Sequence, residues 1–402
     1  MKKSLLALAA LGAFAGAAHA QSSVTLYGVI DAGVDYVSSA QQNATTGGKQ
    51  IALTSGVMQG SRWGVRGTEN LGGGLKAIFT LENGFNLANG KLAQGGSEFG
   101  RQAFVGLSGD FGTVTVGRQY DSVVDFVSGF SAGNQWGSYA AHPGDFDNFN
   151  NSARINNSIK YTSPNNAGFT YSALYSLGGF AGEFQKNRVW SVGAGYANGP
   201  LAFGAAYLNA KNPNLSFYGN TDADANTPLA RGGFGNSIIG NFSTASTLEV
   251  IGVGGSYTFG PATLGLTYSN VKFKDLNDDR SNGKGAGFSG SPKFNNGEVN
   301  LAYQLTPALK VGGAYSYTQG NSVINEVTNE TFSKAKYHQV NLGADYSLSK
   351  RTDVYVVGAY QKASGNKSDV TGQGGVNAQI ANLEESRNDR QAAVRVGLRH
   401  KF

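Results

Sequence analysis

The chain has 402 residues, 59 glycines, only 8 prolines and a formal net charge of +6. It contains no cysteine, which excludes a disulfide-stapled scaffold. The charge is mild and forms no basic run, which argues against a nucleic-acid partner.

The first twenty residues, MKKSLLALAALGAFAGAAHA, have the three parts of a secretory signal. Lys2 and Lys3 form a basic start, residues 5–18 form an apolar stretch, and AHA is a small-x-small cleavage site. The apolar stretch is too short to span a bilayer, and the lysines would gain nothing from a buried helix. We therefore expect residues 1–20 to be removed on export. The mature chain, 21–402, would be one domain starting at Gln21, with the charge lowered by two lysines to +4.

The mature chain begins with a segment that alternates at the strand period of two. Within residues 23–37 one face carries Val24, Leu26, Ile30, Ala32, Val34 and Tyr36, and the other carries Thr25, Tyr27, Asp31 and Asp35. Fifteen further strands are expected at 57–68, 75–85, 98–108, 113–120, 156–163, 168–177, 189–197, 201–210, 247–258, 262–272, 296–305, 309–318, 336–347, 352–362 and 391–402.

The gaps between these strands alternate between two sizes. Short turns rich in Gly, Pro, Asn and Asp are expected at 70–74, 110–112, 164–168, 198–200, 260–261, 306–308 and 349–351. Long connections are expected at 38–56, 86–97, 121–155, 178–188, 211–246, 273–295, 319–335 and 363–390. Short turns on one rim and long loops on the other are typical of an outer-membrane barrel, whereas a soluble sandwich has no reason to keep that alternation.

The third long connection, 121–155, differs from the others in its apolar content. It carries six aromatic residues, Phe126, Phe130, Trp136, Tyr139, Phe146 and Phe149. A loop with so much apolar area must bury it, and the inner wall of a barrel is the available surface. Asp121 is expected to cap a short helix whose apolar face leaves Asp125 pointing away. The connection 363–390 has no aromatic residue and is not expected to fold inward.

The chain ends in a strand that repeats the alternation. Arg395, Arg399 and Lys401 lie on one face, and Val394, Val396, Leu398, His400 and Phe402 lie on the other. In a closed membrane barrel the cationic face lines the lumen and the apolar face contacts lipid. Closure would pair this strand with the first and remove both free edges.

Four segments together resemble one family. They are VTLYGVIDAGV at 24–34, GSRWGVRGTENLGGGLKAIFTLE at 60–82, FVGLSGDFGTVTVGRQYD at 104–121 and the terminal Phe402. They resemble the trimeric general porins of Gram-negative outer membranes, especially those of β-proteobacteria. The resemblance implies an all-β, 16-stranded antiparallel transmembrane β-barrel with short periplasmic turns, long extracellular loops and an inward-folded third loop.

The same resemblance implies a function and partners. It implies a passive, water-filled channel for ions and small hydrophilic solutes, with no cofactor, embedded as a homotrimer in outer-membrane lipid. It also implies that the barrel assembly machinery reads Phe402.

A lumen enclosed by sixteen strands is too wide for side chains to fill, so selectivity requires a narrowing. The resemblance places Arg62 and Arg118 on a basic wall of that narrowing, and Arg154 resembles a third member. Further basic residues of the same region are Arg66, Arg101 and Lys160. The acids expected opposite are Asp125 and Glu82, with Asp121 and Asp145 behind them. Two observations are at odds with parts of this set. The acidic loop tip common in the family is replaced by His142-Pro143-Gly144-Asp145, and Arg118 alternates in phase with Val114 and Val116.

Two other classes of protein are alternatives to a channel. A barrel enzyme would need a base beside a nucleophile, and only His142, His338 and His400 remain after signal cleavage, with no paired spacing for a metal. An adhesin or a structural barrel without an open pore is the third class, and a bilayer conductance measurement would separate it from a channel.

Overall fold

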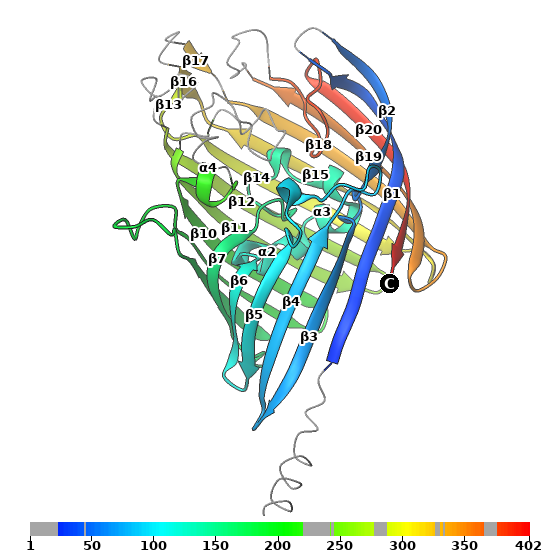
Figure 1. Ribbon diagram of the computed structural model, residues 1–402. Helices are drawn as coiled ribbons and strands as arrows, with labels where there is room; N and C mark the ends of the chain where they lie inside the picture. Colours follow the sequence, from blue (N-terminus) through cyan, green and yellow to red (C-terminus); the bar gives the residue numbers. More distant parts are fainter. Residues whose placement is uncertain are drawn as a thin grey trace, which may run out of the picture.

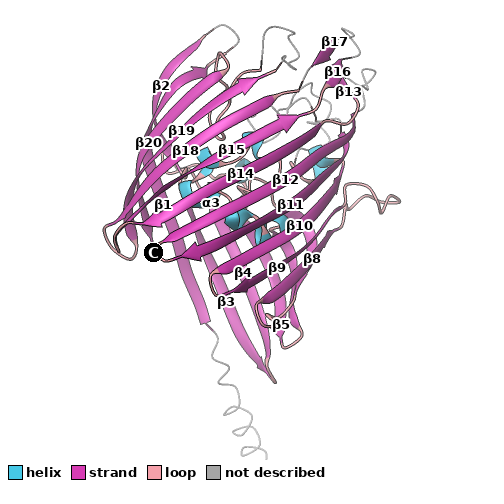
Figure 2. Cartoon of the chain, turned by 180° about the vertical axis from the view of Figure 1, so that it is seen from behind, coloured by secondary structure: helices cyan, strands magenta, loops and turns pink. Residues whose placement is uncertain are grey.

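The computed structural model describes residues 23–43, 46–219, 242, 245–276, 288–325, 330–332, 334–365 and 376–402. The expected signal sequence, residues 1–20, lies outside the described residues. Figures 1 and 2 show one tilted barrel of strands that encloses a few short helices. Among the described residues, no helix is long and apolar enough to cross a membrane.

The barrel wall is a single antiparallel sheet in which sequence neighbours pair. Its strands are β1 (Ser23–Gln41), β2 (Gly47–Ser55), β3 (Arg62–Gly72), β4 (Leu75–Gly84), β5 (Gln102–Gly109), β6 (Gly112–Gln119), β7 (Ile155–Thr162), β8 (Phe169–Ser176), β9 (Val189–Asn198), β10 (Leu201–Lys211), β11 (Ala245–Phe259), β12 (Ala262–Leu276), β14 (Lys293–Gln304), β15 (Leu309–Gly320), β18 (Lys336–Ser347), β19 (Thr352–Ser364) and β20 (Arg390–Lys401). The sheet has 17 strands, but β2 and β3 pair one after the other with the two halves of β1. They therefore occupy one position, and the closed barrel has sixteen.

A small separate sheet consists of β13 (Phe288–Ser289), β16 (Val323–Asn325) and β17 (Glu330–Phe332). Outside the third loop, the described part of the chain has two further short helices, η1 (Gln94–Gly96) and α4 (Pro213–Ser216).

The first long connection was expected at 38–56, and this expectation is wrong. β1 continues to Gln41 and β2 begins at Gly47, so the first two strands form a hairpin with a short connection. Outward-pointing Ile51 and Leu53 alternate with smaller inward residues, which is the strand pattern of β2. The true interruption lies at 56–61, between β2 and β3.

The two faces of the wall are those that the alternation predicts. Val24 and Val396 on the outer face are 68% and 61% exposed, whereas Asp31 and Arg395 on the inner face are fully buried. β20 pairs with β1 from Val29↔Lys401 to Val37↔Ala393, which closes the barrel. Phe402 continues this pairing, because its N–H donates to the carbonyl oxygen of Gly28 and its own carbonyl accepts from the Gly28 N–H.

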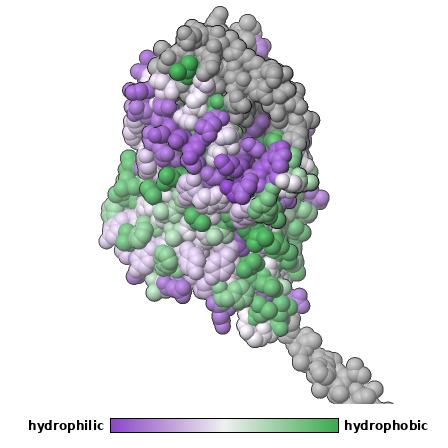
Figure 3. Space-filling view, turned by 90° about the vertical axis from the view of Figure 1, so that its left-hand side faces the viewer, coloured by the Kyte–Doolittle hydropathy of each residue, from purple (hydrophilic) through white to green (hydrophobic). Residues whose placement is uncertain are grey.

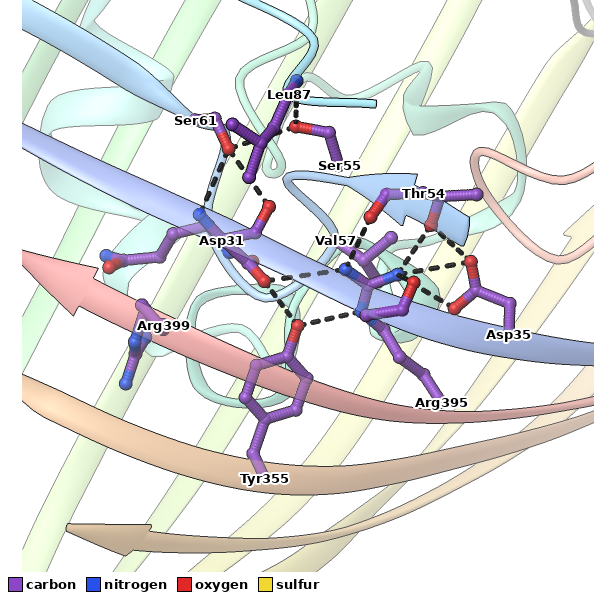
Figure 4. Close-up of polar contacts among 12 residues, drawn as sticks. Asp31, Asp35, Thr54, Ser55, Val57, Ser61, Leu87, Tyr355, Arg395 and Arg399 are labelled. Carbon is purple, nitrogen blue, oxygen red and sulfur yellow. Dashed lines mark hydrogen bonds and ion pairs between the residues drawn. The ribbon is translucent and has the colours of Figure 1, made fainter. Parts of the chain in front are cut away.

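A buried polar network crosses the closure (Figure 4). Arg395 of β20 contacts Asp35 at 2.9 Å (Nη1 to Oδ1) and Asp31 at 3.4 Å (Nη2 to Oδ1), both on β1. Its Nε donates to the hydroxyl of Tyr355 on β19 at 2.7 Å. Its Nη2 donates to the carbonyl oxygen of Thr54 on β2 at 3.1 Å. One arginine therefore connects four strands at the junction of the first and last strands.

The third loop, residues 120–154, folds into the barrel as expected. Its helices are α2 (Ser122–Phe126), η2 (Ser128–Phe130), α3 (Gly133–Trp136), η3 (Ser138–Ala140) and η4 (Pro143–Asp145). Trp136, Tyr139, Phe146 and Phe149 are each at most 2% exposed. Their burial against the wall accounts for the inward position of the loop.

The last long connection departs from its expectation, because part of it also folds inward. Ala378 and Ile380 are fully buried, and Ile380 packs in one cluster with Trp136 and Tyr139 of the third loop. The backbone N–H of Gln379 donates to Oε1 of Gln361, an inward residue of β19. Aliphatic residues and buried amide hydrogen bonds hold this segment inside the barrel. The absence of aromatic residues therefore did not indicate that it stays outside.

Candidate channel constriction

The third loop covers one side of the inner wall and leaves the other side bare. α2 contacts β8, β9 and β10, and η2 contacts β11 and β12. Ala132 donates its N–H to Glu298 of β14, and Gln339 of β18 donates to the carbonyl oxygen of Tyr139. The loop therefore runs along the wall from β8 to β19 and reaches β1, where Tyr139 shares a buried cluster with Val37. It leaves the arc formed by β3–β6 uncovered within the described residues.

Glycines on the wall make room for the loop. A Cβ on Gly193 or Gly204 would collide with Phe126, and one on Gly343 would collide with Trp136. The loop thus lies close to the strands because these inward positions carry no side chain.

Three arginines gather around one acid on the bare arc. Arg101 contacts Glu82 at 2.7 Å (Nε to Oε1), and Arg62 lies 3.7 Å from the other oxygen of Glu82 (Nε to Oε2). Arg154 places its guanidinium over the ring of Tyr120, 5.8 Å from the centroid. We call Arg62, Arg101 and Arg154 the arginine wall. Since Glu82 pairs with two of them and Arg154 makes no ion pair among the described residues, the wall keeps an excess of positive charge.

Two tyrosines that the sequence did not single out complete this group. Tyr27 donates its hydroxyl to Oε2 of Glu82 at 2.9 Å, and Tyr120 donates to Oε1 at 3.1 Å. Arg66 lies over the ring of Tyr27 at 5.2 Å. Tyr27 was recognisable as a lumen-facing residue of β1, but only the fold brings Tyr120 next to Glu82.

Arg154 remains charged at this position. Burial, and next the neighbouring Arg101, lower its pKa to about 10. That value lies far above neutral pH. The Nε of Arg154 is buried and has no hydrogen-bond partner among the described residues.

Glu82, expected opposite the arginines, lies on the same wall as they do. Asp125 is the acid that the loop presents toward the channel, with its side chain 26% exposed. It forms an ion pair with Lys160 of β7, and Lys160 also donates to the carbonyl oxygen of Tyr120 at 3.0 Å. Burial raises the pKa of Asp125, and Lys160 opposes that shift. The acid on the loop is therefore offset by a nearby cation.

The other two acids of the loop have structural partners. Asp121 caps α2 as expected, accepting from the N–H groups of Val123 and Val124 at 2.7 and 3.2 Å. Burial raises its pKa to about 6. Asp145 accepts from the N–H groups of Asn150 and Ser152 at 2.8 and 3.0 Å. Both carboxylates are buried and hold the loop backbone, behind Asp125.

Arg118 makes no ion pair to Glu82 among the described residues, although its charge is felt at Arg154. On the buried side of β6, Thr115 Oγ1 donates to Gln119 Oε1 at 2.6 Å. The pairing register of β6 shifts beyond Gly117, but Arg118 still follows the outward phase of Val116. Its Nε donates to the carbonyl oxygen of Gly100 at 2.8 Å, and Nη1 donates to Asn156. The strand parity noted in the sequence accounts for this position.

A buried histidine holds the second half of the third loop against the barrel wall. His142 Nδ1 lies 2.5 Å from Oδ2 of Asp147, and Nε2 lies 3.5 Å from Oε2 of Glu298 on the wall. Burial would lower the pKa of His142, but the carboxylates of Asp147 and Glu298 outweigh it and raise the pKa to about 10. A charged imidazolium thus bridges the loop and β14, and the serine that contacts this group, Ser269, donates to Asp147 rather than to the histidine.

Comparisons with known proteins agree with this architecture. Residues 7–366 match the family model described as Gram-negative porin. The chain is 31% identical to an outer-membrane porin of Bordetella pertussis and 33% identical to outer membrane porin protein 32 of Delftia acidovorans, each over the full length of both chains. The solved anion-selective porin from Comamonas acidovorans is 27% identical and superposes with a TM-score of 0.69, over 95% of this chain and 100% of that one. The chain belongs to the Gram-negative porin family, and it is a diffusion channel of the outer membrane rather than an enzyme.

Proposed function

We propose that the channel is narrowest between the third loop and the arginine wall, and that it favours anions. The observation that carries the proposal is the charge of the bare arc. Arg62 and Arg101 both pair with the carboxylate of Glu82, Arg154 makes no ion pair among the described residues, and Asp125 of the loop is offset by Lys160. Likeness to the anion-selective porin of Comamonas acidovorans supports the sign of the preference.

The physical reason is the field in a narrow, partly desolvated passage. Unpaired positive charge on one side lowers the energy of an anion and raises that of a cation. The low-dielectric barrel walls screen this field less than bulk water does. Selectivity should therefore be large at low salt and should weaken as the Debye length falls from about 10 Å at 0.1 M to about 3 Å at 1 M.

Reversal potential across a planar bilayer under a potassium chloride gradient tests the proposal. Wild type should show the sign of an anion-preferring pore, and Arg62→Ser/Arg101→Ser/Arg154→Ser should shift it toward cations. Arg351→Ser is the matched control, because it removes the same type of charge from an exposed residue of the short turn between β18 and β19. A wild-type potential in the triple variant would refute the role of the arginine wall.

The mature chain is also proposed to be a homotrimer whose signal ends at Ala20. The resemblance to trimeric porins supports the assembly, and the composition of residues 1–20 supports the cleavage site. The mass of the detergent-solubilised protein from light scattering and the N-terminal sequence of the secreted chain test the two statements. A monomeric mass or a start other than Gln21 would overturn the corresponding one.

A further inference from the structure

The inner wall has a recess on the short-turn side of the arginine wall. It has a volume of about 240 Å³ and lies where β1, β3, β4 and β5 are neighbours (Figure 1). β3 ends and β4 begins at the short turn 73–74, so Arg66 in the recess is closer to that turn than Arg62 is. The recess therefore lies between the arginine wall and the rim of short turns.

The strand register places the side chains that line the recess in two adjoining rows. One row consists of Thr25, Arg66, Thr80 and Phe104, which are paired in succession across β1, β3, β4 and β5. The next row toward the short turns contains Thr68 and Ile78. Both rows are in phase with Glu82 and face the lumen. The outer face of the barrel instead carries apolar side chains below a hydrophilic upper zone (Figure 3).

Arg66 is the cation of the recess. A Cβ on Gly64 would lie 2.8 Å from the ring of Tyr27, so that ring occupies the space over Gly64. The guanidinium of Arg66 lies over the same ring, 5.2 Å from its centroid. This contact holds the guanidinium but gives its N–H groups no oxygen acceptor. Arg66 is exposed and makes no side-chain hydrogen bond or ion pair among the described residues, so these N–H groups are open to an anion in the lumen.

The nearby acids do not neutralise Arg66. Glu82 is already shared by two members of the arginine wall. Glu69 lies opposite Ala77 and has the outward phase of β3. No ion pair joins Arg66 to Asp110, at the next short turn, in the described part of the chain. The recess therefore keeps one positive charge without a counter-charge.

The recess also has an apolar side. Ile78 and Phe104 are diagonal neighbours on β4 and β5, because Phe104 is paired with Thr80. Gly106, directly opposite Ile78, adds no side chain to this face. Ile78 and Phe104 are only half-buried, so both present apolar surface to the water of the lumen. An apolar group of a solute is stabilised when it covers such a surface.

We propose that the recess binds a small organic anion in which a carboxylate is joined to a ring or a short apolar chain. The carboxylate would pair with Arg66 and accept from the hydroxyl of Thr80, while the apolar part would cover Ile78 and Phe104. Pockets for drug-sized ligands have volumes of about 300 to 1,000 Å³, so a recess of about 240 Å³ suits a smaller solute such as a single-ring carboxylate. The inference rests on the proposed anion preference, which brings such a solute past the arginine wall, and it adds a second binding step beyond that wall.

The test measures how strongly each probe reduces the chloride current of single channels in a planar bilayer. The probes are benzoate, which has both groups, acetate, which has only the carboxylate, and benzamide, which has only the ring. In wild type, benzoate should halve the current at a concentration about tenfold below that of acetate, because its ring covers apolar surface. Benzamide should leave the current unchanged.

Two variants separate the two sides of the recess. Arg66→Gln should raise the half-blocking concentration of benzoate about tenfold, the factor for one charge-assisted hydrogen bond, and should weaken the block by acetate as well. Phe104→Thr should raise the value for benzoate about threefold, since an aromatic contact is lost, and should leave the value for acetate unchanged. Arg351→Gln is the matched control, because it removes an exposed guanidinium from the short turn between β18 and β19, and its block should equal that of wild type.

Folding and the proposed function are controlled separately. All variants should form the heat-modifiable folded barrel, and Arg66→Gln should keep the sign of the reversal potential in potassium chloride, because the arginine wall is intact. Equal block of wild type and Arg66→Gln by benzoate, or equal block of wild type by benzoate and acetate, would overturn the recess even if the reversal potential supports the arginine wall. Conversely, a benzoate block that depends on Arg66 in a channel without anion preference would support the recess and refute only the proposed function.

Discussion

At the scale of single residues, His142 couples the position of the third loop to proton binding. The imidazole faces Asp147 from the loop and Glu298 from β14, and both it and these carboxylates are buried. Asp145 and Tyr218 are the other titratable groups near this carboxylate cluster. Because a charged imidazolium compensates two buried carboxylates, its removal leaves charge without a partner.

We predict that His142→Gln lowers stability by about 3 kcal/mol near pH 7, the order of breaking a buried ion pair. The folded pKa of about 10 lies above the ordinary value of 6.5. The stabilising contribution is therefore complete below pH 6.5 and disappears as the pH rises toward 10. Heat-modifiability at several pH values gives the difference between wild type and variant, which should shrink between pH 7 and 10. His338→Gln, a change on the outer face, serves as control, and a difference independent of pH would contradict the prediction.

Two substitutions of Asp121 distinguish its structural role as the cap of α2 from a direct effect on ion selectivity. Asparagine is also a good helix N-cap, so Asp121→Asn should keep α2 and leave the reversal potential unchanged. Asp121→Ala should destabilise the loop by about 1 kcal/mol, because the two N–H groups of α2 lose their acceptor. The two variants are compared by bilayer recording and by heat-modifiability. A cation-to-anion shift in Asp121→Asn would show that this carboxylate acts on ions directly.

Residue roles were only partly accessible from the sequence. The cap at Asp121 was predictable because it depends on the next three residues. Asp145 was not, because the N–H groups that it accepts from belong to a loop whose path is set by contacts with distant strands. The sequence could not rank the arginines, since the position of Arg101 beside Glu82 depends on the pairing of β4 with β5.

At the scale of elements, the third loop is held by apolar contacts along its whole length. Trp136 and Tyr139 belong to one buried cluster, and Phe146 and Phe149 belong to another.

Alternation of period two was enough to predict the strands and their faces, because each side chain meets either lipid or lumen. It failed at residues 38–56, where a turn-like composition hid the continuation of β1 and β2.

We predict that replacing residues 131–139 by a short linker raises single-channel conductance, because this segment narrows the lumen. The matched control shortens the connection at 179–186, whose residues are exposed and extend away from the barrel (Figure 1). Conductance in the control should equal that of wild type. Unchanged conductance in the first variant would mean that the narrowing lies elsewhere. Shortening 376–389 is unsuitable as a control, since Ile380 packs against the third loop cluster.

At the scale of the whole molecule, the barrel depends on joining strands that are far apart in sequence. β1 and β20 meet only when every intervening strand is in register, and Arg395 contacts Asp31 and Asp35 across that junction (Figure 4). The network is fully buried, so its charges depend on each other rather than on water.

Phe402 adds backbone hydrogen bonds to Gly28 at the end of the same seam. We predict that its deletion lowers barrel assembly in cells more than removal of the equally outward Phe203 by Phe203→Ala, and equal yields of heat-modifiable barrel would contradict this.

The closure network itself makes the strongest prediction about the barrel. Arg395→Met should destabilise the closed barrel by about 3 to 5 kcal/mol, because two buried carboxylates lose their cation. Arg399→Met is the control. It contacts Asp353 and Asp345 on β19 and β18 but makes no ion pair to β1 within the described residues, so closure should tolerate it better. Asp31→Asn/Asp35→Asn/Arg395→Met should recover most of the lost stability, since no uncompensated charge remains buried. The fraction of heat-modifiable barrel after refolding in detergent measures all three variants. If Arg395→Met and the triple variant were equally unstable, the arginine would stabilise the seam through packing and hydrogen bonds to Tyr355 and Thr54 rather than by neutralising β1.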